Sequence, residues 1–79
     1  MSKLKVTKPE TVVKALLKIG FKPIRQSGSH LVLRRENDGK WTTVPIHKGK
    51  DVAKGTLRKI LRDAGLSVEE FNKLTKRSD

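Results

Sequence analysis

Apolar residues recur with the spacing of an α-helix in two stretches of the chain. The apolar stripes of these stretches are Val12, Val13, Leu16, Leu17 and Ile19 in the first, and Leu57, Ile60, Leu61 and Ala64 in the second. Residues at i, i+3, i+4 and i+7 share one face of a helix, so each stretch predicts an amphipathic helix. Gly20 and Gly65 follow the two stretches, and glycine is the residue that most often ends a helix.

Two capping patterns mark helix starts. A Ser or Thr followed three residues later by Glu predicts a capping box, because the two side chains bind each other's backbone N–H groups. Thr7 and Glu10 have this spacing before the first stripe, with Pro9 in the first turn, and Ser67 and Glu70 have it near the C-terminus. The second pattern leads into a short apolar series of Val68, Phe71 and Leu74. We therefore predict a third, short helix, and we expect the second helix to open near residues 55–56.

Residues 21–47 change to a period of two, which is typical of β-strands. We predict strands at residues 21–27, 30–36 and 40–47, with Pro23 restricting the first strand to an edge of the sheet. Gly28-Ser29 is the first turn. Asp38-Gly39 is the second, because both positions of a type I′ hairpin turn need a positive φ.

A two-residue loop at Asp38-Gly39 fixes the strand register. It predicts the apolar pairs Leu33–Val44 and Leu31–Ile46 on one face, and the pairs His30–His47 and Arg34–Thr43 on the other, with Val32, Trp41 and Pro45 also on that second face. A slip of one residue would spoil this agreement, whereas a longer loop with the same centre would preserve it.

The predicted order is α-β-β-β-α-α in an α+β fold. Short connections make the three-stranded sheet antiparallel, and the helices bury their stripes on one face while the other stays open to water. This is the layout of a double-stranded RNA-binding domain with a short extra C-terminal helix. We expect one domain over residues 1–79, with residues 1–6 and 76–79 flexible.

Composition narrows the function. The 79 residues include 19 Lys and Arg against 8 Asp and Glu, a formal charge of +11, which predicts a polyanionic partner. The absence of cysteine excludes disulfides, a Cys-ligated zinc site and a thiol nucleophile. No apolar run approaches the roughly 20 residues that span a bilayer, and no apolar segment of a signal peptide follows the basic N-terminus. We expect a cytoplasmic protein without membrane contact.

The two histidines are the only side chains whose ordinary pKa lies near neutral pH. His30 follows the Gly28-Ser29 turn on the predicted open face, where it would serve as a general acid or base in RNA cleavage. His47 would lie opposite and supply the second proton-transfer group. Either histidine is also compatible with an ordinary structural role, His30 as an exposed strand residue and His47 as a partner of the loop that follows.

Cationic side chains surround these positions. The candidate RNA-binding residues are Arg25, Ser29, Arg34, Lys48, Lys50, Lys54 and Arg58. Lys48, Lys50 and Lys54 precede the second helix, whose N-terminus would bind an anion, or they form a solvated basic loop. Trp41 would either stack on a base or cover the sheet edge. We expect Lys14 and Lys18 to form the solvent face of the first helix. Two histidines without cysteines fall short of a zinc ligand set, so we expect neither a metal nor a cofactor.

The chain resembles the HicA (YcfA-like) toxins of bacterial and archaeal toxin–antitoxin systems. The matching stretches are residues 20–21, 25–30 (Arg-Gln-Ser-Gly-Ser-His), 44–47 (Val-Pro-Ile-His), 54–61 and 64–66. The resemblance implies a fold like that of a double-stranded RNA-binding domain and a metal-independent endoribonuclease that cleaves mRNA. It also implies inhibition by a HicB-type antitoxin and a catalytic role for the histidine of the Gly-Ser-His motif, His30.

Two other functions remain compatible with the sequence. One is a module that binds structured RNA without cleaving it, and the other is a protein whose main ligand is an antitoxin, which does not exclude catalysis. We expect the free protein to be a monomer.

Overall fold

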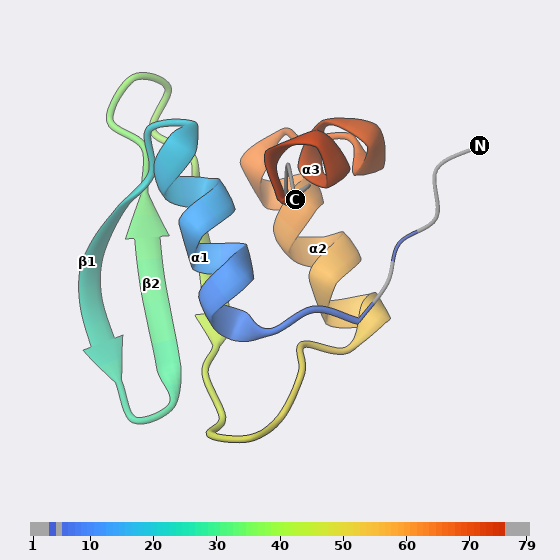
Figure 1. The fold of residues 1–79 in the computed structure, drawn as a ribbon. Helices are drawn as coiled ribbons and strands as arrows, with labels where there is room; N and C mark the ends of the chain where they lie inside the picture. The colour runs from blue at the N-terminus through green and yellow to red at the C-terminus, as the bar shows by residue number, and fades with distance from the viewer. Residues whose placement is uncertain (1–3, 5, 76–79) are drawn as a thin grey trace.

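The computed structural model describes residue 4 and residues 6–75. Within them the elements run α1 (Pro9–Lys18), β1 (Lys22–Ser27), β2 (His30–Arg34), β3 (Trp41–Pro45), α2 (Lys54–Ala64) and α3 (Val68–Thr75). The strands form one antiparallel sheet in the order β1-β2-β3, with the helices gathered on one side of it (Figure 1). The predicted α+β layout is therefore confirmed. The flexibility expected of residues 1–3, 5 and 76–79 concerns positions outside the described residues, whereas Leu4 packs in the core.

The core lies between the helices and the inner face of β2 and β3. Its most buried large side chains include Leu16, Phe21, Leu33, Val44, Leu57 and Ile60. The whole predicted stripe of α2 is buried, and Gly65 ends that helix with a φ of 72°. No helix in the described part of the chain is long and apolar enough to cross a membrane.

The buried stripe of α1 differs from the predicted one. Val12, Ala15 and Leu16 are buried with Ile19 packed beside them, whereas Leu17 is 46% exposed. The observed set has the full i, i+3, i+4, i+7 spacing, but its second member is a small alanine. The prediction counted only large apolar residues, so it omitted Ala15 and wrongly placed Leu17 on the buried face.

The two capping boxes have different outcomes. Ser67 and Glu70 form theirs, with 3.0 Å in each direction, and the hydrogen bonds with Ser67 lower the pKa of the Glu70 carboxyl. The box predicted at Thr7 is wrong, because Lys8 is the N-cap and makes no side-chain capping bond. Pro9 occupies the first turn and holds the preceding residue in an extended conformation. Thr7 therefore lies outside the helix, where its carbonyl accepts a hydrogen bond from the Val52 N–H at 2.7 Å.

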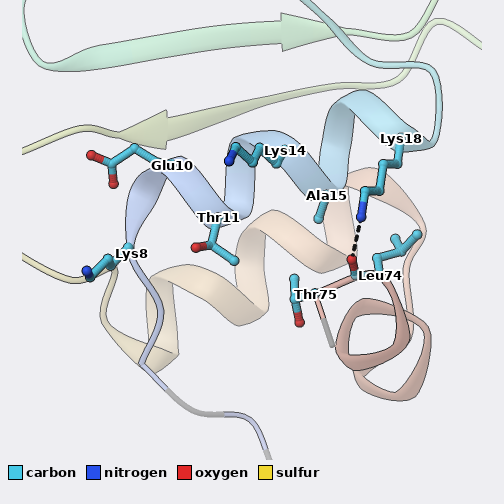
Figure 2. Close-up of a pocket in the computed structure, with 8 residues that line it drawn as sticks. All are labelled: Lys8, Glu10, Thr11, Lys14, Ala15, Lys18, Leu74 and Thr75. Carbon is cyan, nitrogen blue, oxygen red and sulfur yellow. Dashed lines mark hydrogen bonds between the residues drawn. The ribbon is translucent and has the colours of Figure 1, made fainter. Parts of the chain in front are cut away.

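Helix α3 packs against α1 around a pocket of about 420 Å³ (Figure 2). Lys18 Nζ donates to the Leu74 carbonyl oxygen at 2.9 Å, which joins the last turn of α1 to the last turn of α3. Lys14 and Lys18 are both exposed, as expected of the solvent face of α1, but Lys18 also has this contact with α3. Its ammonium group binds one of the carbonyls that a helix C-terminus leaves without a partner.

The β2–β3 hairpin has a longer loop than predicted. His30 pairs with Pro45 and Arg34 with Trp41, so the register is shifted by two residues and His30 does not pair with His47. Lys40 is the partner of Arg35, whose N–H donates to its carbonyl at 2.8 Å, and the loop between them is residues 36–39. Because side chains alternate with a period of two, a shift of two residues leaves the predicted faces unchanged.

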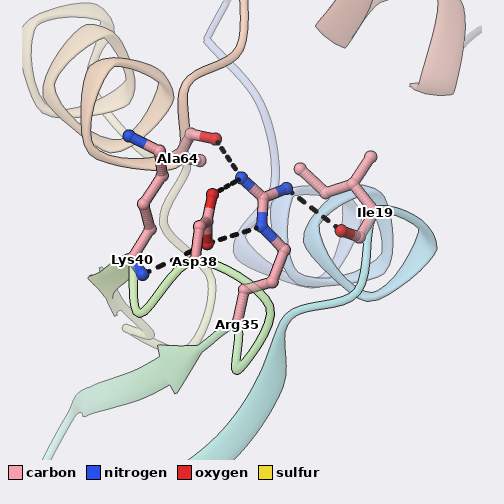
Figure 3. A network of polar contacts seen from close by, with 5 residues as sticks. All are labelled: Ile19, Arg35, Asp38, Lys40 and Ala64. Atoms are coloured by element: carbon pink, nitrogen blue, oxygen red, sulfur yellow. Dashed lines mark hydrogen bonds and ion pairs between the residues drawn. The ribbon is translucent and has the colours of Figure 1, made fainter.

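Arg35 explains why the longer loop is stable. Its guanidinium group donates to both Asp38 carboxylate oxygens, at 3.1 and 2.8 Å, and to the Ile19 and Ala64 carbonyl oxygens at 3.1 and 3.3 Å (Figure 3). It also lies 4.7 Å from the centre of the Phe21 ring. One side chain thus ties the loop to the C-terminal ends of α1 and α2. The Arg35 hydrogen bonds lower the pKa of Asp38 to about 2.

Candidate active site

The two histidines lie together at the end of the sheet opposite the β2–β3 loop. Their ring centroids are 6.5 Å apart with an angle of 78° between the ring planes, and both residues are exposed. His30 opens β2, and His47 follows β3 by two residues. The predicted proximity is therefore present, although the two residues are not direct partners in the register.

The turn before His30 holds that histidine in place. Gly28 has a φ of 59°, a conformation that glycine adopts without steric cost. Gln26 Nε2 donates to the Gly28 carbonyl oxygen at 3.2 Å, and the Ser29 carbonyl accepts a hydrogen bond from the Ile46 N–H. The second bond ties the turn to the chain between β3 and His47. Ser29 is half-buried and contributes its backbone to this arrangement.

A β-bulge places Arg25 on the open face. Pro23 pairs with Leu33, but Arg25 pairs with Val32, so Ile24 is the extra residue. Val32 lies on the same side of β2 as His30, and cross-strand partners share a face. Without the bulge, Arg25 would pair with Leu31, on the face that the helices cover. The bulge therefore turns a guanidinium group toward the side of the sheet that carries His30.

Arg34 shares this face but not the immediate surroundings of the histidines. It pairs with Trp41 at the loop end of the sheet, four residues along β2 from His30. At the strand rise of roughly 3.3 Å per residue, this separation is about 13 Å. Arg34 is therefore not part of the immediate group around the two histidines.

The segment after β3 forms a pocket beside His47. The pocket has a volume of about 220 Å³ and is lined by Lys8, Pro9, Glu10, His47, Gly49, Lys50 and Asp51. The Lys50 N–H donates to the His47 carbonyl oxygen at 3.0 Å, which closes the turn. Lys8 belongs to this pocket because the Thr7–Val52 bridge holds the start of the chain against the loop. No sequence spacing predicts its presence there.

The remaining predicted cations surround this end of the molecule more loosely. Lys48 is exposed in the loop, Lys54 is the first residue of α2, and Arg58 is exposed one turn later. Figure 1 shows that α1 and α2 both begin at the end of the molecule where β2 begins and β3 ends. Helix N-termini carry a partial positive charge, so their backbone adds to the positive potential there. Among the described residues, no hydrogen bond or ion pair joins these three cations to the histidines.

The site therefore combines two adjacent imidazoles with cationic side chains and an open approach. Such an arrangement can transfer protons on both sides of a phosphate group while the cations bind its negative charge. Within the described residues, no group of three or more His, Asp or Glu side chains is placed to hold a metal ion.

These features define a small basic α+β protein with an exposed histidine pair at one end of an open sheet face. Residues 9–66 match a protein-family model described as the HicA toxin of bacterial toxin–antitoxin. The chain therefore belongs to the HicA toxin family and is the toxin of a toxin–antitoxin system. The match extends from the start of α1 to the residue after Gly65 and includes both histidines. A comparison with curated proteins gives no match.

Proposed function

We propose that this toxin is a metal-independent endoribonuclease that cleaves mRNA with His30 as an acid–base group and is neutralised by a HicB-type antitoxin. The observation that carries the proposal is the pair of exposed imidazoles, 6.5 Å apart, in a strongly basic chain. Membership of the HicA family supports the same activity.

The proposed reaction needs two proton transfers. One imidazole removes the proton from a ribose 2′-hydroxyl, whose oxygen then attacks the adjacent phosphorus. The bond from phosphorus to the 5′-oxygen breaks as the second imidazole, protonated, gives its proton to that oxygen. The products are a 2′,3′-cyclic phosphate and a 5′-hydroxyl. His30 takes one of these roles, and His47 is the candidate for the other.

Cations support this reaction by binding phosphate groups. Arg25 lies on the face of His30, and Lys50 lines the pocket beside His47. Neither side chain forms an ion pair with the described residues, so both are free to bind an anion. Lys48, Lys54 and Arg58 extend the positive surface around the site. Together with the formal charge of +11, this surface suits a polyanionic substrate.

Incubation of a long single-stranded RNA with the purified protein in excess EDTA tests the activity. We expect cleavage by the wild type, with cyclic phosphate ends, and no detectable cleavage by His30→Ala over the same time. Circular dichroism and thermal unfolding of both proteins provide the control for folding. A folded His30→Ala variant that cuts RNA at the wild-type rate would remove His30 from the mechanism.

The antitoxin is tested by its effect on the same assay. We expect the product of an adjacent reading frame to co-purify with the toxin and to suppress cleavage, because an acidic surface would complement the basic site. Full cleavage in the presence of a stoichiometric bound partner would contradict inhibition.

The second candidate is a module that binds structured RNA without cleaving it. It is favoured by the α-β-β-β-α layout and by Arg25 and Lys50, which form no ion pair within the described part of the chain. Intact RNA after long incubation with antitoxin-free protein, together with tight binding, would support this function over the nuclease.

A further inference from the structure

Trp41 is a large apolar side chain that the fold leaves in water. It is the single tryptophan of the chain and is 60% exposed. It opens β3 opposite Arg34, and neither its ring nor its N–H has a partner among the described residues. The other face of β3 is filled by Thr42 and Val44, which are buried. The register therefore directs the indole away from the core.

Trp41 shares the open face with the histidine pair. Arg34 and His30 stand on the same side of β2, and their pairing with Trp41 and Pro45 places the indole about 13 Å from His30 along the strands. Arg34 forms no ion pair with the described residues and is the cross-strand partner of Trp41 on this face. One end of this face thus offers proton-transfer groups, and the other offers an aromatic surface beside a free guanidinium group.

We propose that Trp41 and Arg34 form a subsite for one unpaired nucleobase and its phosphate, so that the substrate is single-stranded RNA lying along the open face. This inference rests on the proposed nuclease function and names its substrate class. Proteins that bind single strands combine aromatic side chains, on which bases stack, with cations that follow the backbone. In a duplex the faces of the bases are already stacked on one another, and an A-form helix presents mainly its backbone and minor groove.

Charge decides between RNA and a protein as the occupant of this face. The face carries Arg25 and Arg34, and the chain carries a formal charge of +11. A polyanion with flat aromatic groups complements both the arginines and the indole. The separation of about 13 Å between Trp41 and His30 along the strands also suits RNA. Sheets that bind single strands stack two or three bases along a comparable face.

Tryptophan fluorescence tests the proposal directly, because all of it comes from residue 41. The probes are a single-stranded RNA carrying 2′-O-methyl groups, which lacks the attacking hydroxyl and cannot be cleaved, and the same strand in a duplex. We expect saturable quenching by the single strand and at most weak quenching by the duplex. Binding of the single strand, seen by anisotropy of a labelled RNA, without a change in fluorescence would overturn the proposal, as would equal quenching by the duplex.

Substitutions measure the size of the effect. We expect Trp41→Ala to weaken binding of the single strand by about 5- to 100-fold and Trp41→Phe to restore most of it. Leu17→Ala is the matched control, because Leu17 is also exposed but lies on α1, and we expect no change. A set of RNAs, each lacking the base at one position, locates the base that stacks on the indole. We expect the wild type to bind one member of this set more weakly than the intact RNA. Trp41→Ala should bind that member and the intact RNA equally well.

The same experiments separate this inference from the nuclease function. If the wild type cleaves RNA and Trp41→Ala binds it equally well, the subsite is wrong and the nuclease stands. If Trp41→Ala loses antitoxin binding but keeps RNA affinity, the face belongs to the protein partner and the proposal fails. If the wild type neither binds nor cleaves RNA, both proposals fail.

Discussion

The two ends of the sheet carry similar residues but use them differently. At the loop end, Arg35 and Asp38 bind each other, and Arg35 also binds the carbonyls that end α1 and α2 (Figure 3). At the opposite end, His30 and His47 contact each other, but the cations around them have no ion-pair partner among the described residues. Each end includes a turn with a glycine of positive φ, Gly39 at the loop end and Gly28 at the histidine end.

The difference separates structure from function in a chain with a large excess of positive charge. A cation that binds carbonyls and a carboxylate holds elements together, and its loss costs stability. A cation left in water costs little to remove, so its presence at a histidine pair points to a ligand. Arg34 and Arg35 show the contrast most directly. They are adjacent in sequence, but of the two only the Arg35 guanidinium group forms hydrogen bonds or an ion pair with the described residues.

The largest expected effect is at the histidine end. We predict that His30→Ala lowers the cleavage rate by about 10²- to 10⁴-fold, the usual contribution of a positioned acid or base, while the unfolding temperature stays the same. His47→Ala should lose one limb of the pH–rate profile if it supplies the second proton-transfer group. Single-turnover cleavage across pH 5–9 measures both, and an unchanged profile for His47→Ala would leave His30 without this partner.

The adjacent arginines sharpen the comparison. Arg35→Ala should lower the free energy of unfolding by about 1–3 kcal/mol, because carbonyls of α1 and α2 lose a charged donor, and should leave cleavage unchanged where the protein is folded. Arg34→Ala should weaken RNA binding without a change in stability. Urea unfolding and RNA titration of the two variants measure this, and equal effects on both properties would erase the distinction between the two ends.

The two turn glycines form a second matched pair. Gly28 and Gly39 have φ values of 59° and 71°, and a Cβ would meet no atom within 4 Å at either. Replacement by alanine should therefore cost about 1 kcal/mol of stability at each position through backbone strain alone. Cleavage should fall only for Gly28→Ala, whose turn positions His30. An equal loss of activity for Gly39→Ala would show that the activity follows overall stability.

The smallest effect concerns acid stability. The Asp38 carboxyl has a pKa of about 2 in the folded protein against an ordinary value of 3.8, so the stabilisation it provides is present above pH 3.8. It is lost as the pH falls toward 2. Wild-type unfolding midpoints in urea should therefore drop more steeply over this range than those of Asp38→Asn. Parallel curves for the two proteins would contradict the ion pair.

The sequence predicted what depends on local pattern. The stripe of α2, its end at Gly65, the capping box at Ser67 and the two faces of the hairpin follow from spacing alone and are confirmed. The predicted faces of the hairpin are correct although its predicted register is wrong, because a shift of two residues keeps the side-chain alternation. The proximity of His30 and His47 was predicted for the same reason, although Pro45 is the true partner of His30.

The errors and omissions come from contacts between distant residues. The Arg35 side chain donates hydrogen bonds to the Ile19 and Ala64 carbonyl oxygens, and no local pattern connects these residues to the hairpin. These contacts hold the longer loop, so the loop length could not be predicted from the hairpin sequence alone. The Thr7–Val52 bridge likewise pairs Thr7 with a distant residue and brings Lys8 to the pocket beside His47. Arg25 lies on the open face because of a bulge in β1, and the sequence of β1 does not predict that bulge.

The most direct test measures cleavage and thermal unfolding together for the wild type, His30→Ala and Arg35→Ala, with RNA in excess EDTA below all unfolding temperatures. We predict a stable but inactive His30→Ala and an active but less stable Arg35→Ala. A stable His30→Ala that cleaves RNA as fast as the wild type would contradict the assignment of the histidine end as the active site.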